Sequence, residues 1–160
     1  MKLLSYSTLI HLPVENVNLY EWLINLSEKE YKSCSKAHRA IGLFKNENVE
    51  GMVNVENIGG NLLIQHYHII TKEKDNVFLR SEKSDAYLSH LIRVHVSVEW
   101  RMTVTHKDAQ SCIFTCKIGT EYPNKALAIA GKLAAVSYFM KRHLKGEGEK
   151  FARNIERKYQ

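Results

Sequence analysis

The stretch ALAIAGKLAAVSYFMKRHLKGEGEKFARNI, residues 126–155, decides how the rest of the chain can fold. At about 100° per residue, its apolar side chains fall on one stripe of an α-helix, and most of its lysines and arginines fall on the flanks or the far side. A helix of this kind needs a second layer to cover the stripe. We therefore expect a long C-terminal helix that packs on the remaining chain through Ala126, Ile129, Leu133, Val136, Met140, Leu144, Phe151 and Ile155.

Two polar residues interrupt this pattern. Glu147 stands inside the apolar stripe, and His143 stands at its edge, one helical turn earlier. Burying an isolated charge is costly, so a carboxylate in this position must be protonated, paired with a cation or bound to a metal. Residues four apart lie on one helix face, and an imidazole and a carboxylate placed in this way can bind one ion together.

The chain before this helix has the pattern of β-strands. Residues 91–105 alternate strictly between apolar and polar, which is typical of a half-buried antiparallel strand. Ile58-Gly59-Gly60 is a tight-turn signal that predicts a hairpin between the two segments that flank it. The predicted strands are residues 3–12, 48–57, 61–71, 76–82, 91–105 and 110–120, with short helices at 14–26 and near 28–37 in an otherwise irregular segment, 27–47.

This order of elements predicts an α+β fold in which a curved antiparallel sheet of about six strands wraps around one long C-terminal helix. That is the helix-grip arrangement, and it leaves an internal cavity between sheet and helix. In length and element order the chain resembles the SRPBCC or START-like superfamily over residues 1–160, read as one domain. The superfamily includes lipid carriers, polyketide cyclases or aromatases, hydroxylase subunits and hydrolases, so the resemblance implies a cavity rather than one reaction.

A second histidine and a second glutamate join His143 and Glu147 as candidate ligands. His38 lies in SKAHRAIGLF, and Glu56 lies in NVENIGGN, at the end of the first hairpin strand. The four residues resemble the ligand pattern of the zinc-dependent branch of the superfamily, which includes diacetylphloroglucinol hydrolase and phloretin hydrolase. Imidazole and carboxylate ligands suit zinc or another divalent metal. The resemblance therefore implies a metal site of His38, Glu56, His143 and Glu147.

The same resemblance implies a reaction, the hydrolysis of a carbon–carbon bond next to the carbonyl of an apolar or aromatic ketone. A metal would polarise the acyl oxygen and activate water, and Glu56 or Glu147 would serve as the catalytic base. The alternative is a protein that binds a small apolar or aromatic molecule without metal, of the lipid-carrier or polyketide-cyclase kind. In that case Glu147 would be paired with a basic residue.

Four residues are expected to line the cavity, namely His66, His68, Trp100 and Met140. His66 and His68 also resemble the first metal motif of the cupins, but Arg80 stands where the cupin spacing expects a glycine, and a second cupin motif is absent. The two histidines share one strand face, which leaves them as cavity-lining or surface residues. In a helix grip we expect that face to look into the cavity.

The composition excludes several classes of protein. No stretch approaches 18 continuous apolar residues, so no membrane span is expected. The first residues lack the features of a secretory signal. Three cysteines without CxxC spacing leave an odd thiol, which favours a reducing compartment such as the cytoplasm.

The net charge of +6 comes largely from the C-terminal helix, where lysines and arginines alternate with the apolar stripe. A solvated helix face accounts for this pattern. A nucleic-acid surface would need aromatic residues interleaved on a basic strand face, and the sequence has none. No nucleic-acid partner is therefore expected, and the oligomeric state stays open.

Overall fold

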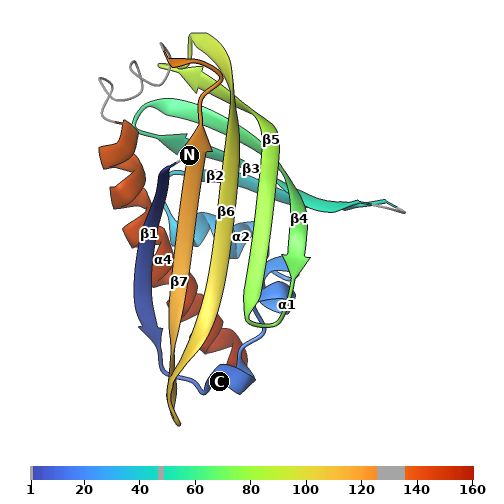
Figure 1. Cartoon of the computed structure of the whole chain (residues 1–160), viewed down its shortest axis with the longest axis vertical. Coiled ribbons are helices and arrows are strands. Elements are labelled where there is room, and N and C mark those ends of the chain that lie inside the picture. The colour runs from blue at the N-terminus through green and yellow to red at the C-terminus, as the bar shows by residue number, and fades with distance from the viewer. Residues whose placement is uncertain (1, 47–48, 126–135) are drawn as a thin grey trace.

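The computed structural model describes residues 2–46, 49–125 and 136–160 (Figure 1). One antiparallel sheet curves around the helices, which lie together on one of its faces. Its strand order is β1-β7-β6-β5-β4-β3-β2. The elements are β1 (Lys2–Ile10), the 3-10 turn η1 (Val14–Asn16), α1 (Leu19–Ile24), α2 (Glu28–Cys34), β2 (His38–Lys45), β3 (Glu50–Ile58), β4 (Asn61–Lys72), β5 (Asn76–Leu88), β6 (Ile92–Asp108), β7 (Ser111–Glu121) and α4 (Val136–Tyr159).

This is the helix-grip fold expected from the sequence, with seven strands among the described residues where about six were predicted. The missed strand is β2, which begins at His38, in the segment expected to be irregular. It lies at the edge of the sheet, a β-bulge between His38 and Ala40 shifts its pairing with β3, and its burial does not alternate regularly. An edge strand of this kind lacks the period of two on which strand prediction depends.

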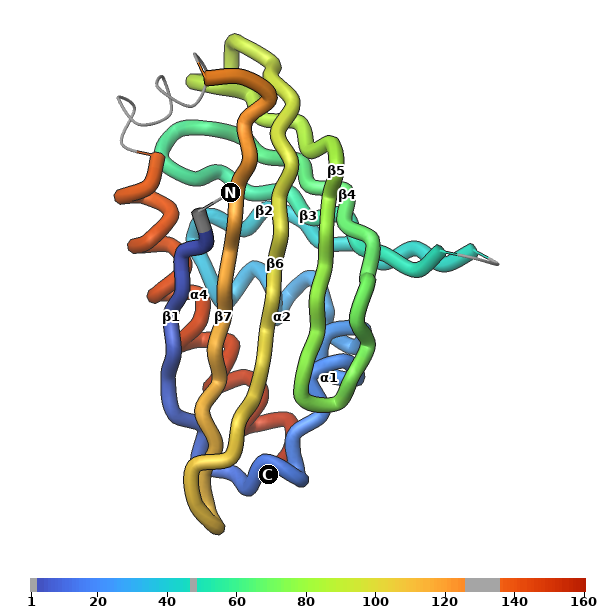
Figure 2. Tube along the Cα trace, viewed as in Figure 1, coloured from blue at the N-terminus to red at the C-terminus, as the bar shows by residue number. Residues whose placement is uncertain are grey.

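Strand β6 follows its predicted alternation, whereas β5 runs to Leu88, beyond its predicted range of 76–82. On β6, Val96, Val98, Trp100, Met102 and Val104 are all buried toward the helices. The β3–β4 hairpin turns at Gly59 and Gly60, which have φ of 58° and 79°, a backbone region that favours glycine. Figure 2 follows the chain through these long, curved strands.

The long helix α4 packs along β1 and β7 through the predicted stripe. Met140, Leu144, Phe151 and Ile155 are buried, whereas Ala126, Ile129 and Leu133 lie outside the described residues. A Cβ atom at Gly148 would lie 2.8 Å from the Tyr6 ring, so glycine allows the helix to approach β1 this closely. No helix in the described ranges is long and apolar enough to cross a membrane.

Two short helices lie with α4 on the inner face of the sheet (Figure 1). Residues 14–26 form a 3-10 turn and then α1, instead of the continuous helix that was predicted, and Asn18 caps α1 by accepting from the Glu21 amide. Helix α2 starts with a capping box between Ser27 and Glu30 and ends at Cys34. This register turns Tyr31 and Cys34 inward.

The expectation that His66 and His68 line the cavity is wrong. Both side chains are exposed on the outer face of β4, while Gln65, Tyr67 and Ile69 are buried on the inner face. Apolar residues occur at both odd and even positions of this strand, so the sequence pattern alone did not determine which face is buried. A shift of one residue exchanges the two faces of a strand.

Candidate metal centre

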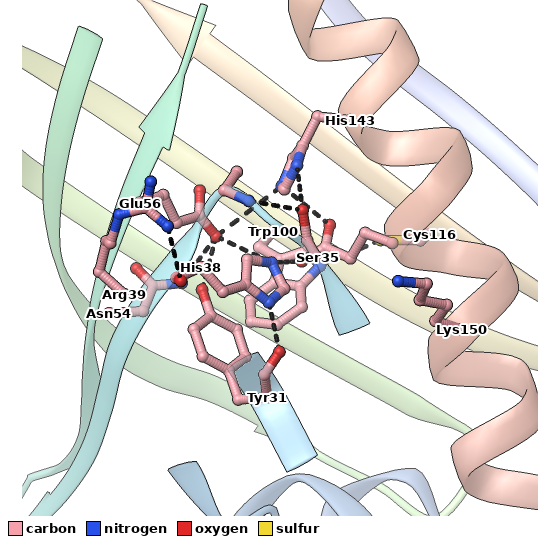
Figure 3. A network of polar contacts seen from close by, with 12 residues as sticks. Tyr31, Ser35, His38, Arg39, Asn54, Glu56, Trp100, Cys116, His143 and Lys150 are labelled. Atoms are coloured by element: carbon pink, nitrogen blue, oxygen red, sulfur yellow. Dashed lines mark hydrogen bonds and ion pairs between the residues drawn. The ribbon is translucent and has the colours of Figure 1, made fainter. Parts of the chain in front are cut away.

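The fold brings the four predicted ligands together from three elements. His38 opens β2 and Glu56 lies opposite it on β3, where the two residues are register partners. His143 and Glu147 lie one turn apart among the buried residues of α4, and Figure 3 shows His143 pointing from the helix toward His38 and Glu56. All four are buried, and one ligand atom from each lies within 4.8 Å of the other three. We call these four residues the His/Glu cluster.

The distances within the His/Glu cluster are those of a compact group. His38 Nε2 lies 3.0 Å from Glu147 Oε1 and 3.7 Å from Glu56 Oε1. His143 Nε2 lies 3.6 Å from Glu147 Oε2 and 4.0 Å from Glu56 Oε1. Ligand atoms placed tetrahedrally about 2.0–2.1 Å from zinc lie roughly 3.4 Å from one another. The observed separations bracket this value.

Both histidines direct Nε2 inward because their Nδ1 atoms have partners outside the His/Glu cluster. His38 Nδ1 lies 2.6 Å from the Tyr31 carbonyl oxygen, and since a carbonyl only accepts, Nδ1 carries the proton and donates. His143 Nδ1 lies 3.2 Å from Ser35 Oγ. Metal-binding histidines in proteins are commonly oriented in this way by a second hydrogen bond on the other ring nitrogen.

Two buried atoms of the His/Glu cluster lack hydrogen-bond partners within the described part of the chain. They are His143 Nε2 and Glu147 Oε2, which face each other at 3.6 Å. Buried polar atoms in proteins nearly always have a partner, so an orphaned pair calls for an explanation. A divalent cation between the imidazoles and carboxylates would satisfy both atoms, and the donor set fits such an ion.

The environment shifts the pKa values of the two glutamates in opposite directions. Burial raises the pKa of Glu147, but the charge of His143 and the hydrogen bond with His38 outweigh burial and hold that pKa below its usual value. For Glu56, burial and the nearby Glu147 carboxylate raise the pKa, against the opposing effect of the histidines. Glu147 is thus the carboxylate held as an anion, and Glu56 is the one that more readily carries a proton.

Tyr31 supports the His/Glu cluster and was not singled out from the sequence. Its hydroxyl donates to Glu56 Oε1 at 2.6 Å, its carbonyl accepts from His38, and its ring stacks on the His38 imidazole with centroids 3.8 Å apart. Burial, followed by the charges of Glu56 and Glu147, raises the pKa of Tyr31 well above its usual value, so its hydroxyl stays a donor. The capping box at Ser27 was the available signal, because it fixes the helix register that turns Tyr31 inward.

An apolar cavity of about 190 Å³ is lined by neighbours of the His/Glu cluster in the fold, although none of the four cluster residues lines it. Ile58 and Leu63 line the cavity next to Glu56: Ile58 is two residues further along β3, and Leu63 is the register partner of Glu56 on β4. Met140 also lines it, three residues before His143 on α4. An engineered cavity of about 150 Å³ with apolar walls can hold benzene, so this volume suits one ring or a short chain.

Trp100 does not line this cavity. Its indole is packed in the core, where Nε1–H points to Cys116 Sγ at 3.1 Å and the ring lies 5.9 Å from that of Phe151. Its predicted place in the cavity is therefore corrected. Of the four predicted cavity residues, Met140 is the one that lines this cavity.

Similarity to known proteins is visible in the structure and not in the sequence. No protein-family model and no curated protein matches the chain. Among solved structures, a protein from Thermus thermophilus aligns with TM-score 0.72 at 11% identity, covering 99% of this chain and 100% of that one. At these identities a structural likeness establishes the fold and leaves the chemistry open.

Two further neighbours carry informative descriptions. A START superfamily protein from Mycobacterium smegmatis aligns with TM-score 0.61 at 12% identity over 97% of both chains. The Zhui aromatase/cyclase from Streptomyces sp. R1128 aligns with TM-score 0.63 at 11% identity, covering 99% of this chain and 96% of that one. The chain thus has a START-like helix-grip fold, in which the His/Glu cluster is a group that can hold a metal ion.

Proposed function

We propose that this protein is a metal-dependent hydrolase, with zinc or another divalent ion, that cleaves a carbon–carbon bond next to the carbonyl of an apolar or aromatic ketone. The observation that carries the proposal is the pair of buried atoms, His143 Nε2 and Glu147 Oε2, that lack hydrogen-bond partners within the described residues. Met140, one turn before His143 on α4, lines the apolar cavity. Retaining unsatisfied groups of this kind costs stability, which is typical of a functional site.

His38, His143 and Glu147 would hold the ion. The Tyr31 carbonyl and Ser35 keep the two imidazoles turned inward, and Glu147 stays ionised between them. A divalent ion bound there would supply Lewis acidity toward the ketone oxygen and would make a water molecule more acidic.

Glu56 is proposed as the general base. It lies opposite His38 in the register of β2 and β3, and the Tyr31 hydroxyl, 2.6 Å from Oε1, holds the carboxylate in place. In the overall reaction one water is consumed. Its oxygen bonds to the acyl carbon, which leaves as a carboxylic acid, and the electron pair of the broken bond takes a proton on the departing carbon. Glu56 would take the proton from water and return it there.

A second candidate function is binding or cyclisation of an apolar molecule without a metal. It is favoured by the 3.0 Å contact between His38 Nε2 and Glu147 Oε1, which pairs the buried carboxylate with a base. The aromatase/cyclase neighbour has the same fold. The two functions differ in one measurable respect, the presence of a bound ion.

Elemental analysis of protein purified without a nickel column tests the proposal. We expect about one equivalent of a divalent metal in the native protein and less than about a tenth in the His38→Ala and Glu147→Gln variants. His66→Ala is the matched control, because His66 is an exposed histidine on the outer face of the sheet. A native protein without metal, or equal metal in all four proteins, would overturn the proposal in favour of the metal-free function.

The reaction is tested with aryl alkyl ketones in ¹⁸O-labelled water. Hydrolysis places one ¹⁸O in the carboxylic acid product, and mass spectrometry detects it. We expect the Glu56→Gln variant to lose at least about 100-fold in turnover, the range of a general base. A variant that keeps full turnover would remove Glu56 from the role of base.

A further inference from the structure

A groove on the surface leads toward the His/Glu cluster. It runs between the α2–β2 connection, the β3–β4 turn and α4, and has a volume of about 400 Å³. His143 lies along it, so the groove reaches one of the candidate ligands from outside. Ile58 and Phe139 line both the groove and the apolar cavity, so the two spaces adjoin at these residues.

The charged side chains along the groove are all cationic. Lys36, Arg142 and Lys150 line it, and no aspartate or glutamate is among its lining residues in the described ranges. Lys150 donates to the Ser33 carbonyl oxygen at 3.2 Å, and Figure 3 shows it on α4 beside the His/Glu cluster. Within the described part of the chain, neither Lys36 nor Arg142 forms an ion pair. The groove therefore has an uncompensated positive charge.

The α4 side of the groove is shaped to let a compact group approach. Arg142, Gly146 and Lys150 are spaced four apart, so they lie in one row along the helix. A Cβ atom at Gly146 would meet no other atom within 4 Å. The helix surface between the two cations is thus bare. The planar guanidinium of Arg142 can bind a carboxylate through two hydrogen bonds, and the ammonium of Lys150 can attract a compact anion as a point charge.

We infer that the ligand of this protein carries an anionic group, such as a carboxylate, which binds in the groove at Arg142, Lys150 and Lys36 while the apolar part occupies the cavity. The inference deepens the proposed function and rests on it, because the proposed function supplies the ketone that reacts. The substrate would then be an apolar or aromatic keto acid. The cationic groove would also attract such anions from solution, and salt would weaken that attraction.

The test compares two probes of equal shape, 4-phenylbutanoate and 4-phenylbutanamide, by calorimetry at low salt. The protein is first stripped of metal with a chelator, so that the carboxylate cannot gain affinity by binding an ion. We expect the acid to bind about tenfold more tightly than the amide, a difference in free energy of roughly 1.4 kcal/mol.

Two double variants, each of which removes two positive charges, test whether the preference for the acid arises in the groove. Arg142→Gln with Lys150→Gln is expected to bring the affinity ratio of acid to amide close to one and to leave the amide affinity unchanged. Lys141→Gln with Lys145→Gln is the control, because both lysines are exposed on α4 but do not line the groove. It is expected to keep the ratio.

The inference would be overturned by equal binding of acid and amide, by no binding of either, or by an equal loss of the ratio in the control. A preference for the acid that appears only with metal restored would also overturn it, because the carboxylate would then be bound to the ion. The same measurements in the Glu147→Gln variant separate the two proposals. A charge preference retained there shows that the groove acts independently of the metal site.

Discussion

The two halves of α4 bury polar groups in opposite ways. In the C-terminal half, Phe151 and Ile155 are buried, and the polar residue among them, Asn154, is satisfied. Its Oδ1 accepts from Trp22 Nε1 at 2.8 Å, and its Nδ2 donates to Glu30 Oε1 at 3.4 Å. In the N-terminal half, His143 Nε2 and Glu147 Oε2 are also buried, and they lack hydrogen-bond partners within the described residues.

This contrast distinguishes buried polar groups that stabilise the fold from buried polar groups that a ligand would satisfy. A buried amide with partners at both ends costs little, because protein hydrogen bonds replace those lost from water. A buried pair whose atoms lack hydrogen-bond partners costs stability and is retained where a ligand satisfies it. The C-terminal half is the structural anchor of the helix, and the N-terminal half is the candidate site.

The largest effect on stability is expected from Phe151→Ala in the anchoring half. Phe151 is fully buried, with its ring 5.0 Å from that of Trp22. The variant should lose about 3–5 kcal/mol of unfolding free energy, measured by urea denaturation. Because the Phe151 ring also stacks on the His38 imidazole, with centroids 6.1 Å apart, some loss of metal affinity is expected, but a smaller one than in Glu147→Gln. A loss of metal at full stability would contradict the division between the two halves.

Glu147→Gln should mainly lower metal affinity, whereas Phe151→Ala mainly lowers stability. It removes one ligand of the proposed ion while nearly preserving side-chain volume. We expect metal affinity to fall at least about 100-fold, with a smaller change in the stability of the metal-free protein than Phe151→Ala produces. Competition with a chromophoric chelator measures the affinity. Unchanged affinity would show that the carboxylate is not a ligand.

Asn154→Ala should destabilise without affecting metal. It leaves the buried Trp22 indole N–H without its partner, at a cost of about 1–3 kcal/mol. Asn154→Asp is the matched variant, because an acceptor oxygen is retained. Urea denaturation of both variants measures the cost, and equal stability of the native protein and the alanine variant would contradict the anchoring role of this hydrogen bond.

Tyr31→Phe tests the support of the candidate site. The ring still stacks on His38, but the hydroxyl that donates to Glu56 is lost. Outer partners of metal ligands commonly contribute about 10–100-fold in metal affinity or activity. Because Glu56 is the proposed general base, we expect a loss in that range in turnover, measured with the ¹⁸O assay, and a smaller change in metal affinity by chelator competition. Tyr20→Phe is the control, since it removes a hydroxyl that donates to Glu50, which is not in the His/Glu cluster.

The smallest expected effect is a pH dependence of stability at Glu30 on α2, which accepts a hydrogen bond from Asn154 in the anchoring half. Hydrogen bonds from the Ser27 side chain and backbone lower the pKa of Glu30, and Asn154 adds to the shift. A folded-state pKa below the unfolded value means that the contribution of Glu30 is fully present above the unfolded pKa and is lost as pH falls through the folded one. The stability difference between native protein and Glu30→Gln should therefore shrink below about pH 4. A constant difference would contradict the assignment.

The sequence predicted the features that depend on local period and missed those that depend on tertiary contacts. The stripe of α4 and the alternation of β6 were visible because their periods are regular. The side chains of Glu147 and His143 stood out because they break such a period. The edge strand β2, the outward face of His66 and His68, and the packed position of Trp100 depend on neighbouring strands.

Tyr31 belongs to the same missed class. The capping box at Ser27 indicates only that Tyr31 turns inward. Its contacts with His38 and Glu56 could not be predicted, because those partners come from two other elements. Orphaned atoms are likewise invisible in a sequence. The candidate ligands could be proposed from residue types, but the case for an ion depends on which of their atoms lack partners.

The most direct test of the proposed metal site is X-ray absorption at the metal edge of the natively purified protein. We predict a shell of nitrogen and oxygen ligands at about 2.0–2.2 Å with the scattering of two imidazoles, from His38 and His143, and its loss in Glu147→Gln. A protein without metal, or a shell without imidazole scattering, would contradict the claim that the N-terminal half of α4 is a metal site.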